Sequence, residues 1–188
     1  MANQIAIWKA EHVNFLRLLN LLDAEIRVFH EGGRPNYDLM LDIVYYLIHY
    51  PDRFHHPKED VAMEKLLHKA PNCQSLASEL TREHKVIADS GTALLEQLQG
   101  VVGGALMPRA AVEGPAATYA AYYRRHMARE EAELFPRVDQ SLKTKDWTAV
   151  EKAVPTGRDP LFGDRTEERY AVLRRQIAAA AGDNLAKA

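Results

Sequence analysis

The chain has 188 residues, which fits one domain of ordinary size around a single hydrophobic core. Its 24 basic and 26 acidic residues leave a formal charge of -2, so we expect neither nucleic acid nor an anionic membrane as a partner. Cys73 is the only cysteine, which excludes an internal disulfide and a thiolate metal cluster and favours a reduced, cytoplasmic setting. The first residues lack a signal-peptide pattern, and no apolar run reaches the roughly 18 residues of a membrane span.

Apolar residues recur at spacings of three and four along four long segments, which is typical of amphipathic helices and predicts an all-α fold. The first segment covers about 3–29 and ends at the loop EGGRPN, where glycine and proline favour a turn. The second segment covers about 37–69 and ends at APN. Pro51 and Pro57 interrupt it, and because each removes a backbone hydrogen bond, we expect a bend or a bulge there.

The third segment covers about 73–99 and is followed by the glycine-rich loop GVVGGALMP. The fourth begins near Pro115, a residue type favoured at the start of a helix, and reaches about Leu142. Four long helices with short connections predict an up-down-up-down four-helix bundle over residues 1–142.

The remaining residues, 143–188, predict a helical extension that packs on the bundle. A short helix, DWTAVEKAV, is expected to be capped by Asp146, and the loop PTGRDPLFG follows it. Asp164 and Glu167 have the spacing of a capping box at the start of a final amphipathic helix. This extension could cover the bundle or form the interface of a homodimer.

Five of the eight histidines fall at one level of the predicted bundle. Two residues on antiparallel helices lie at the same height when the intervening loop falls near their sequence midpoint. The three predicted loops meet this condition for His12, His55 or His56, His84 and His126, taken in succession. A single histidine on an apolar face is usually a hydrogen-bonded core residue, but the convergence of several predicts a metal site.

Two glutamates complete this site, because residues four apart lie on one face of a helix. Glu59 follows His55 at that spacing in FHHPKED, and Glu130 follows His126 in HMAREEAELFP. His56 lies about 100° from His55, so one helix can offer imidazoles to two metal ions with Glu59 between them. Imidazole suits iron, zinc, copper and nickel, and bridging carboxylates suit a dinuclear iron or manganese site. Buried carboxylates are costly alone but are neutralised beside two cations.

These motifs, with EHVNFL and REHKVI, resemble those of the hemerythrin-like HHE cation-binding proteins over roughly residues 1–142. The resemblance implies a four-helix bundle that holds two iron ions joined by an oxo or hydroxo bridge, with zinc or manganese as substitutes. It also implies that carboxylates bridge the two ions and that histidines cap each one. Carried over to this chain, the ligands are His12, His55, Glu59, His84, His126 and Glu130.

One ligand of the oxygen-carrying hemerythrins is missing from this sequence. Those proteins place two histidines one turn apart on the third helix, whereas Leu80 stands four residues before His84 here. We expect His56 to supply the missing ligand, and His49, seven residues before it, is the rival candidate. The division of His55 and His56 between the two metals stays open, because the prolines disturb the helix around them.

Other polar residues are expected to orient the ligands or to line the approach to them. Asp60 is an alternative to Glu59 as the bridge, and Glu83 and Glu131 adjoin ligands but point about 100° away, which suits solvation or hydrogen bonding to ligand histidines. One of several nearby tyrosines could donate a hydrogen bond to an iron-bound oxygen species. The candidates for these supporting roles are His49, Asp60, Glu83 and Tyr123.

Three functions fit these observations. The first is a di-iron protein that binds O2 or a related small diatomic as a carrier, store or sensor, which the nitrogen-rich ligand set favours by family analogy. The second is a redox or repair protein that reduces nitric oxide or peroxide or donates iron. The third is a metal-stabilised structural or signalling module. We favour the first, a binding protein rather than an enzyme.

Overall fold

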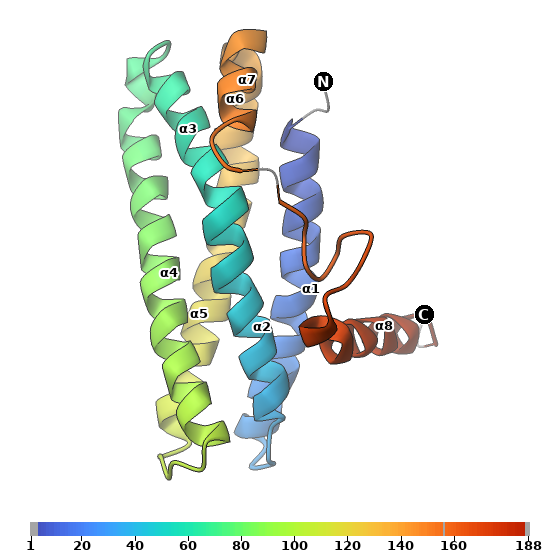
Figure 1. Cartoon of the computed structure of the whole chain (residues 1–188). Coiled ribbons are helices and arrows are strands. Elements are labelled where there is room, and N and C mark those ends of the chain that lie inside the picture. Colours follow the sequence, from blue (N-terminus) through green and yellow to red (C-terminus); the bar gives the residue numbers. More distant parts are fainter. Residues whose placement is uncertain (1–3, 156, 187–188) are drawn as a thin grey trace.

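The computed structural model describes residues 4–155 and 157–186, and the side chains of these residues up to 180. Every regular element in this part of the chain is helical, as predicted, and none is a strand. Four rods run side by side along the molecule (Figure 1). Their elements, in chain order, are α1 (Gln4–His30), α2 (Tyr37–Tyr50), the π-helical turn η1 (Pro51–His55), α3 (His56–Leu67), the 3-10 turn η2 (Pro71–Cys73), α4 (Gln74–Val102), α5 (Ala110–Arg129), the π-helical turn η3 (Glu130–Leu134) and α6 (Phe135–Ser141).

The second rod comprises α2, η1 and α3, and the fourth comprises α5, η3 and α6. The bend or bulge expected at Pro51 and Pro57 is confirmed as the π-helical turn η1. The extension beyond the rods contains α7 (Thr144–Glu151), the 3-10 turn η4 (Glu168–Tyr170) and α8 (Ala171–Ala186). None of the described helices is both long enough and apolar enough to span a membrane.

Short turns join α1 to α2 and α4 to α5 at the lower end of the bundle in Figure 1. Gly32 adopts a φ of 79°, a conformation that favours glycine, directly after α1. Asn36 caps α2, because its side-chain oxygen accepts a hydrogen bond from the backbone N–H of Leu39 at 3.0 Å. The Arg109 guanidinium then donates to the carbonyl oxygens of Phe29 and Gly33, which ties the start of α5 to this first turn.

Two apolar clusters fill the interior of the bundle, and a polar layer lies between them. The larger cluster contains Phe15, Leu47 and Leu94 among many others, and the smaller contains Trp8 and Leu80. Leu80 is wholly buried in the smaller cluster, so this position, where a second histidine of α4 was looked for, serves packing. The amphipathic stripes of the sequence thus form an ordinary close-packed core on both sides of the polar layer.

Three expected helix starts were wrong in detail. α5 begins at Ala110, five residues before Pro115; burial of Val112 and the helix-forming alanines offset the one hydrogen bond that the proline removes. Asp146 is the third residue of α7 rather than its cap, and its carboxylate accepts a hydrogen bond from the backbone N–H of Lys143 at 2.8 Å.

The final helix, α8, begins at Ala171, well after the expected cap at Asp164. The preceding residues form a loop instead, in which the Asp159 carboxylate accepts from the backbone N–H groups of Leu161 and Phe162. The extension rests on the bundle, because Leu161 of this loop, Tyr170 of η4 and Leu173 of α8 are buried in the larger apolar cluster. The Tyr46 hydroxyl also donates to Asp159 at 2.8 Å.

Candidate metal centre

Seven polar side chains from all four rods meet in the buried layer between the two apolar clusters. Each is at most 6% exposed. Metal-ligating residues were expected at these positions of the sequence, and the structure brings all seven together. They are His12, His55, His56, Glu59, His84, His126 and Glu130.

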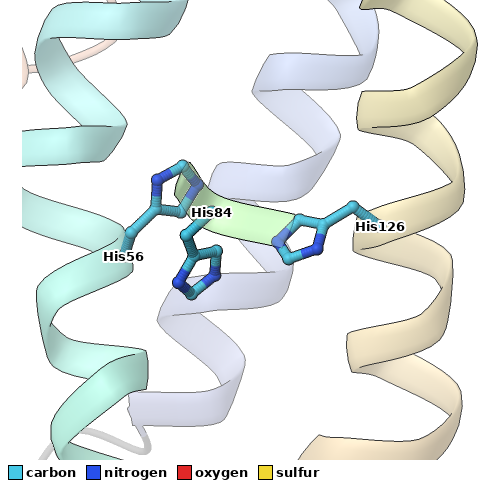
Figure 2. Close-up of side chains that lie close together, drawn as sticks. All are labelled: His56, His84 and His126. Carbon is cyan, nitrogen blue, oxygen red and sulfur yellow. The ribbon is translucent and has the colours of Figure 1, made fainter. Parts of the chain in front are cut away.

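His56, His84 and His126 form what we call the three-imidazole cluster. They project from α3, α4 and α5, and Figure 2 shows their rings gathered in the space between these rods. One nitrogen of each ring lies within 4.8 Å of the others. The ring centroid of His84 lies 4.3 Å from that of His56 and 4.8 Å from that of His126. One transition-metal cation could be held by three nitrogens in this arrangement.

His12 from α1 and His55 from η1 form the two-imidazole cluster. Their Nε2 atoms are only 3.1 Å apart. One oxygen each from Glu59 and Glu130 joins them, and the four ligand atoms all lie within 4.8 Å of one another. This cluster offers a second cation two nitrogens and two oxygens.

Glu59 and Glu130 each face both clusters. The Oε1 of Glu59 lies 3.2 Å from the Nε2 of His55, and its Oε2 lies 3.6 Å from the Nε2 of His84. The Oε2 of Glu130 lies 3.5 Å from the Nε2 of His12, and its Oε1 lies 3.2 Å from that of His84. Each carboxylate therefore turns one oxygen toward each cluster, which is the arrangement of a bridging ligand.

Several atoms of this layer have no hydrogen-bond partner within the described part of the chain. They include both carboxylate oxygens of Glu59, Oε2 of Glu130 and Nε2 of His126. Buried polar atoms are nearly always satisfied, and leaving them unpaired costs free energy. Two cations would satisfy all four atoms at once, so the residues present fit a dinuclear metal centre.

A family model for the hemerythrin HHE cation-binding domain matches residues 3–138. The chain belongs to this hemerythrin family. The resemblance drawn from the sequence motifs is thereby confirmed, and all seven residues of the layer lie within the match. No curated protein and no solved structure matches the chain.

A ring of outer carboxylates surrounds this hemerythrin-like centre. One carboxylate on each rod accepts a hydrogen bond from the Nδ1 of a histidine on the next rod, and the fourth rod pairs with the first in this way. The pairs are Glu11 with His55 at 2.7 Å, Asp60 with His84 at 2.9 Å, Glu83 with His126 at 2.9 Å, and Glu131 with His12 at 2.9 Å. Asp52 serves the fifth imidazole, His56, from four residues earlier on the same rod, at 2.8 Å.

These contacts orient all five rings. An ionised carboxylate can only accept a hydrogen bond, so each Nδ1 carries the proton and each Nε2 is left to face the centre. Glu83 and Asp60 occupy the supporting positions expected from the sequence, and Glu131 makes the hydrogen bond that was one of its expected roles. Glu11 and Asp52 were missed. The spacing of four between Asp52 and His56 could have indicated the second, but nothing local indicates that Glu11 serves another helix.

Both shared carboxylates lie close to a π-helical turn: Glu130 is the first residue of η3, and Glu59 lies four residues after the end of η1. In the second rod the N–H of His56 closes η1 by donating to the Pro51 carbonyl, and Pro57 follows at once. In the fourth rod the N–H of Phe135 donates to the Glu130 carbonyl, and Pro136 follows. A proline lacks the N–H that an α-helix needs and its ring crowds the carbonyl four residues back, which a wider turn relieves. The turn at Glu130 was not expected from the sequence.

The wider turn explains why His49 lies away from the centre. Seven residues bring an α-helix back to nearly the same face, but the turn at η1 carries an extra residue and rotates the chain. His49 is therefore exposed, and its Nδ1 lies 2.7 Å from the Tyr45 carbonyl oxygen. His49 is therefore not placed as a rival ligand to His56, and its role as a supporting or channel residue stays a prediction. Tyr123 is wholly buried, and its ring lies 6.2 Å from that of His56.

Burial and neighbouring charges divide the imidazoles into two kinds. Burial, reinforced by nearby imidazoles, lowers the pKa of His12 to about 4 and that of His56 well below its usual value. Burial acts in the same direction on His55 and His84, but the carboxylates around them outweigh it and raise the pKa of each to about 10. When no cation is bound, the two-imidazole cluster thus holds one neutral and one protonated imidazole at pH 7. The three-imidazole cluster holds one neutral imidazole, His56, and two whose pKa is raised by nearby carboxylates, His84 and His126.

The two carboxylates that face both clusters also differ. Burial, with the negative charge of Glu130, raises the pKa of Glu59 to about 7. Burial opposes ionisation of Glu130 as well, but the imidazoles of His126 and His84 outweigh it and hold its pKa well below the usual range. Two carboxylates so close repel one another, and bound cations would remove that repulsion.

Proposed function

We propose that this protein holds two iron ions and binds O2 or a related small molecule as a carrier, store or sensor. In this proposal, the three-imidazole cluster holds one ion, the two-imidazole cluster holds the other, and Glu59 and Glu130 bridge them. The observation that carries the proposal is that both carboxylates turn one oxygen toward each cluster. Membership of a cation-binding family supports it independently.

The choice of iron rests on the donor set. Five imidazoles and two bridging carboxylates suit iron, while zinc or manganese could occupy the same ligands. Two iron ions would supply the reversible electron exchange that holds a diatomic molecule. A nitrogen-rich set with only two carboxylates inside the layer favours binding over oxygen activation, by analogy within the family.

The chain contributes orientation and a dry environment. The outer carboxylates hold every imidazole with Nε2 inward, so little rearrangement is needed when a cation binds. Aromatic rings close the layer, with Phe135 centred 5.5 Å from His12 and Phe15 centred 5.2 Å from His55. Such rings exclude bulk water and strengthen the interaction between ligands and cations.

Metal analysis combined with absorption spectra tests the proposal. The iron-reconstituted protein should hold about two ions per chain, and reduced protein exposed to air should develop a charge-transfer band that disappears when O2 is removed. Failure to hold two ions would refute the dinuclear centre. Two ions with no reversible band would refute oxygen carriage but leave the metal centre standing. The cytoplasmic location, the homodimer and the absence of nucleic-acid and membrane partners stay predictions.

A further inference from the structure

Two tyrosines on α5 form a pair of buried hydroxyls beside the metal layer. Tyr119 and Tyr123 are 2% and 0% exposed, and their ring centroids are 5.7 Å apart in an edge-to-face arrangement. Neither hydroxyl has a hydrogen-bond partner among the residues that the structure describes. Buried tyrosine hydroxyls usually find a partner, so two adjacent ones without any require an explanation.

Tyr123 lies beside the three-imidazole cluster, and the Phe15 ring separates it from His55 of the two-imidazole cluster. Its ring centroid is 6.2 Å from that of His56, a member of the three-imidazole cluster. It is also 6.2 Å from that of Phe15, whose ring is centred 5.2 Å from His55 of the two-imidazole cluster. The charges of Glu59 and Glu130 act on its hydroxyl. Tyr123 therefore lies beside the metal layer on the side of His56, one helical turn before His126.

Tyr119 packs against Tyr123 on the same side of the layer, and the position of its ring requires a glycine on α4. A Cβ atom on Gly91 would lie 3.0 Å from Cε2 of Tyr119 and closer still to Cγ2 of Ile48. Glycine inside a helix lowers stability relative to alanine. At Gly91 it is needed because a side chain there would collide with the rings and methyl groups packed against it, including Tyr119. The Asp52 charge acts on both hydroxyls, which places them on one side of the layer, next to His56.

Both hydroxyls can act as hydrogen-bond donors. Burial, together with nearby negative charges, raises the pKa of each well above the usual value for tyrosine, so both keep their protons. A donor without an acceptor in the protein suits a ligand that brings one. Hydrogen bonds to a charged acceptor are stronger than those to a neutral one.

We propose that the hydroxyls of Tyr119 and Tyr123 donate hydrogen bonds to a small anion that binds at the metal centre, and so favour anionic ligands over neutral ones. This inference rests on the proposed function, because the charge of two iron ions is needed to exceed that of Glu59 and Glu130. The ligand class is a compact anion that accepts hydrogen bonds, for which azide is the probe.

Azide titration of iron-loaded variants tests this inference. Tyr123→Phe and Tyr119→Phe remove one hydroxyl each, and Tyr122→Phe, a half-exposed tyrosine on the same helix, is the matched control. Azide affinity, followed by absorption, should fall about tenfold in each test variant and stay unchanged in the control. Iron content should not change. The thermal midpoint of the iron-free variants should not fall, since no hydrogen bond within the protein is lost.

The remaining outcomes separate this inference from the proposed function. If the parent protein holds two iron ions but azide affinity in both test variants stays within about twofold, the hydroxyl pair has no such role and the inference is overturned. The same conclusion follows if the iron-loaded parent binds no azide, although the metal centre would then stand. If the parent holds no iron, both proposals fail. The two single variants are independent, so poor folding of one leaves the other as a decisive measurement.

Discussion

The two imidazole clusters share Glu59 and Glu130 but draw their nitrogens differently. The three-imidazole cluster takes one ring from each of three rods, and His56 is the member that the family pattern did not supply. The two-imidazole cluster takes its rings from the first two rods only. One ion would therefore have three nitrogens and two oxygens, and the other one nitrogen fewer. The difference leaves the two-imidazole side with one protein ligand fewer.

The largest expected effect comes from removing what the clusters share. Glu130→Gln keeps the shape of the side chain but removes the charge that faces both clusters, so binding of both ions should weaken. The metal content should fall from about two ions per chain to less than about one. Elemental analysis and circular dichroism measure metal content and fold. The control is Glu133→Gln, because Glu133 is 46% exposed and pairs with Arg129 outside the layer. Retention of both ions in Glu130→Gln would contradict the bridging role.

Single imidazole variants should separate the clusters. His56→Ala should remove the ion of the three-imidazole cluster and His12→Ala that of the two-imidazole cluster, which leaves about one ion per chain in each case. His68→Ala, at an exposed histidine, should retain both. Metal content and the absorption spectrum of each variant are the measurements. If His56→Ala kept two ions at unchanged affinity, His56 would not be a ligand, and the asymmetry between the clusters would disappear.

The level of the histidines could be predicted from the sequence because helix geometry is regular. Loop positions and a constant rise per residue place His12, His84 and His126 at one height without any knowledge of packing. The pair of His55 and Glu59 follows from the same periodicity, since both lie where η1 gives way to an ordinary helix. Spacing alone thus brought five imidazoles and two carboxylates together as candidates, with His49 and Asp60 as alternatives to His56 and Glu59.

The outer carboxylates and the second π-helical turn could not be predicted in the same way. Glu11 precedes His12 in the chain but serves His55 on the neighbouring rod, a relation that depends on how the rods are rotated. Helical periodicity shows which side chains point inward only to within about one residue. The π-helical turn η1 then rotates the second rod, so residues before and after it no longer share one face. The placing of His49 as a rival ligand has this cause, because an α-helix was assumed across the wider turn.

A smaller effect should follow from loosening one imidazole in one cluster. Glu83→Gln weakens the hydrogen bond to His126 but leaves all seven inner residues, so affinity for one of the two ions should fall about 10- to 100-fold. Competition with a chelator of known affinity measures this. Glu79→Gln is the matched control, since Glu79 binds the same Arg129 side chain as Glu83 but no imidazole. Equal loss in both variants would assign the effect to Arg129.

The smallest expected effect is on the pH dependence of stability, when protons rather than cations occupy the imidazoles. His55 and His84, one in each cluster, have their pKa raised to about 10 by nearby carboxylates despite burial. From about pH 7 to 10 the folded, metal-free protein therefore binds more protons than the unfolded chain, whose histidines titrate near 6.5. Its stability should fall as the pH rises through this window, because the protons that offset Glu59 and Glu130 are lost.

His12 and His56 should contribute little over that range, because their lowered pKa keeps them neutral in the folded state and the ordinary histidine pKa of about 6.5 leaves them mostly neutral in the unfolded chain. Thermal midpoints at pH 7 and pH 9, with and without chelator, measure the effect. In the metal-loaded protein, cations hold the imidazoles unprotonated at Nε2, so the alkaline decline should be much weaker. A metal-free protein with the same midpoint at both pH values would show that neither cluster depends on its bound protons, and the raised pKa of His55 and His84 would be contradicted.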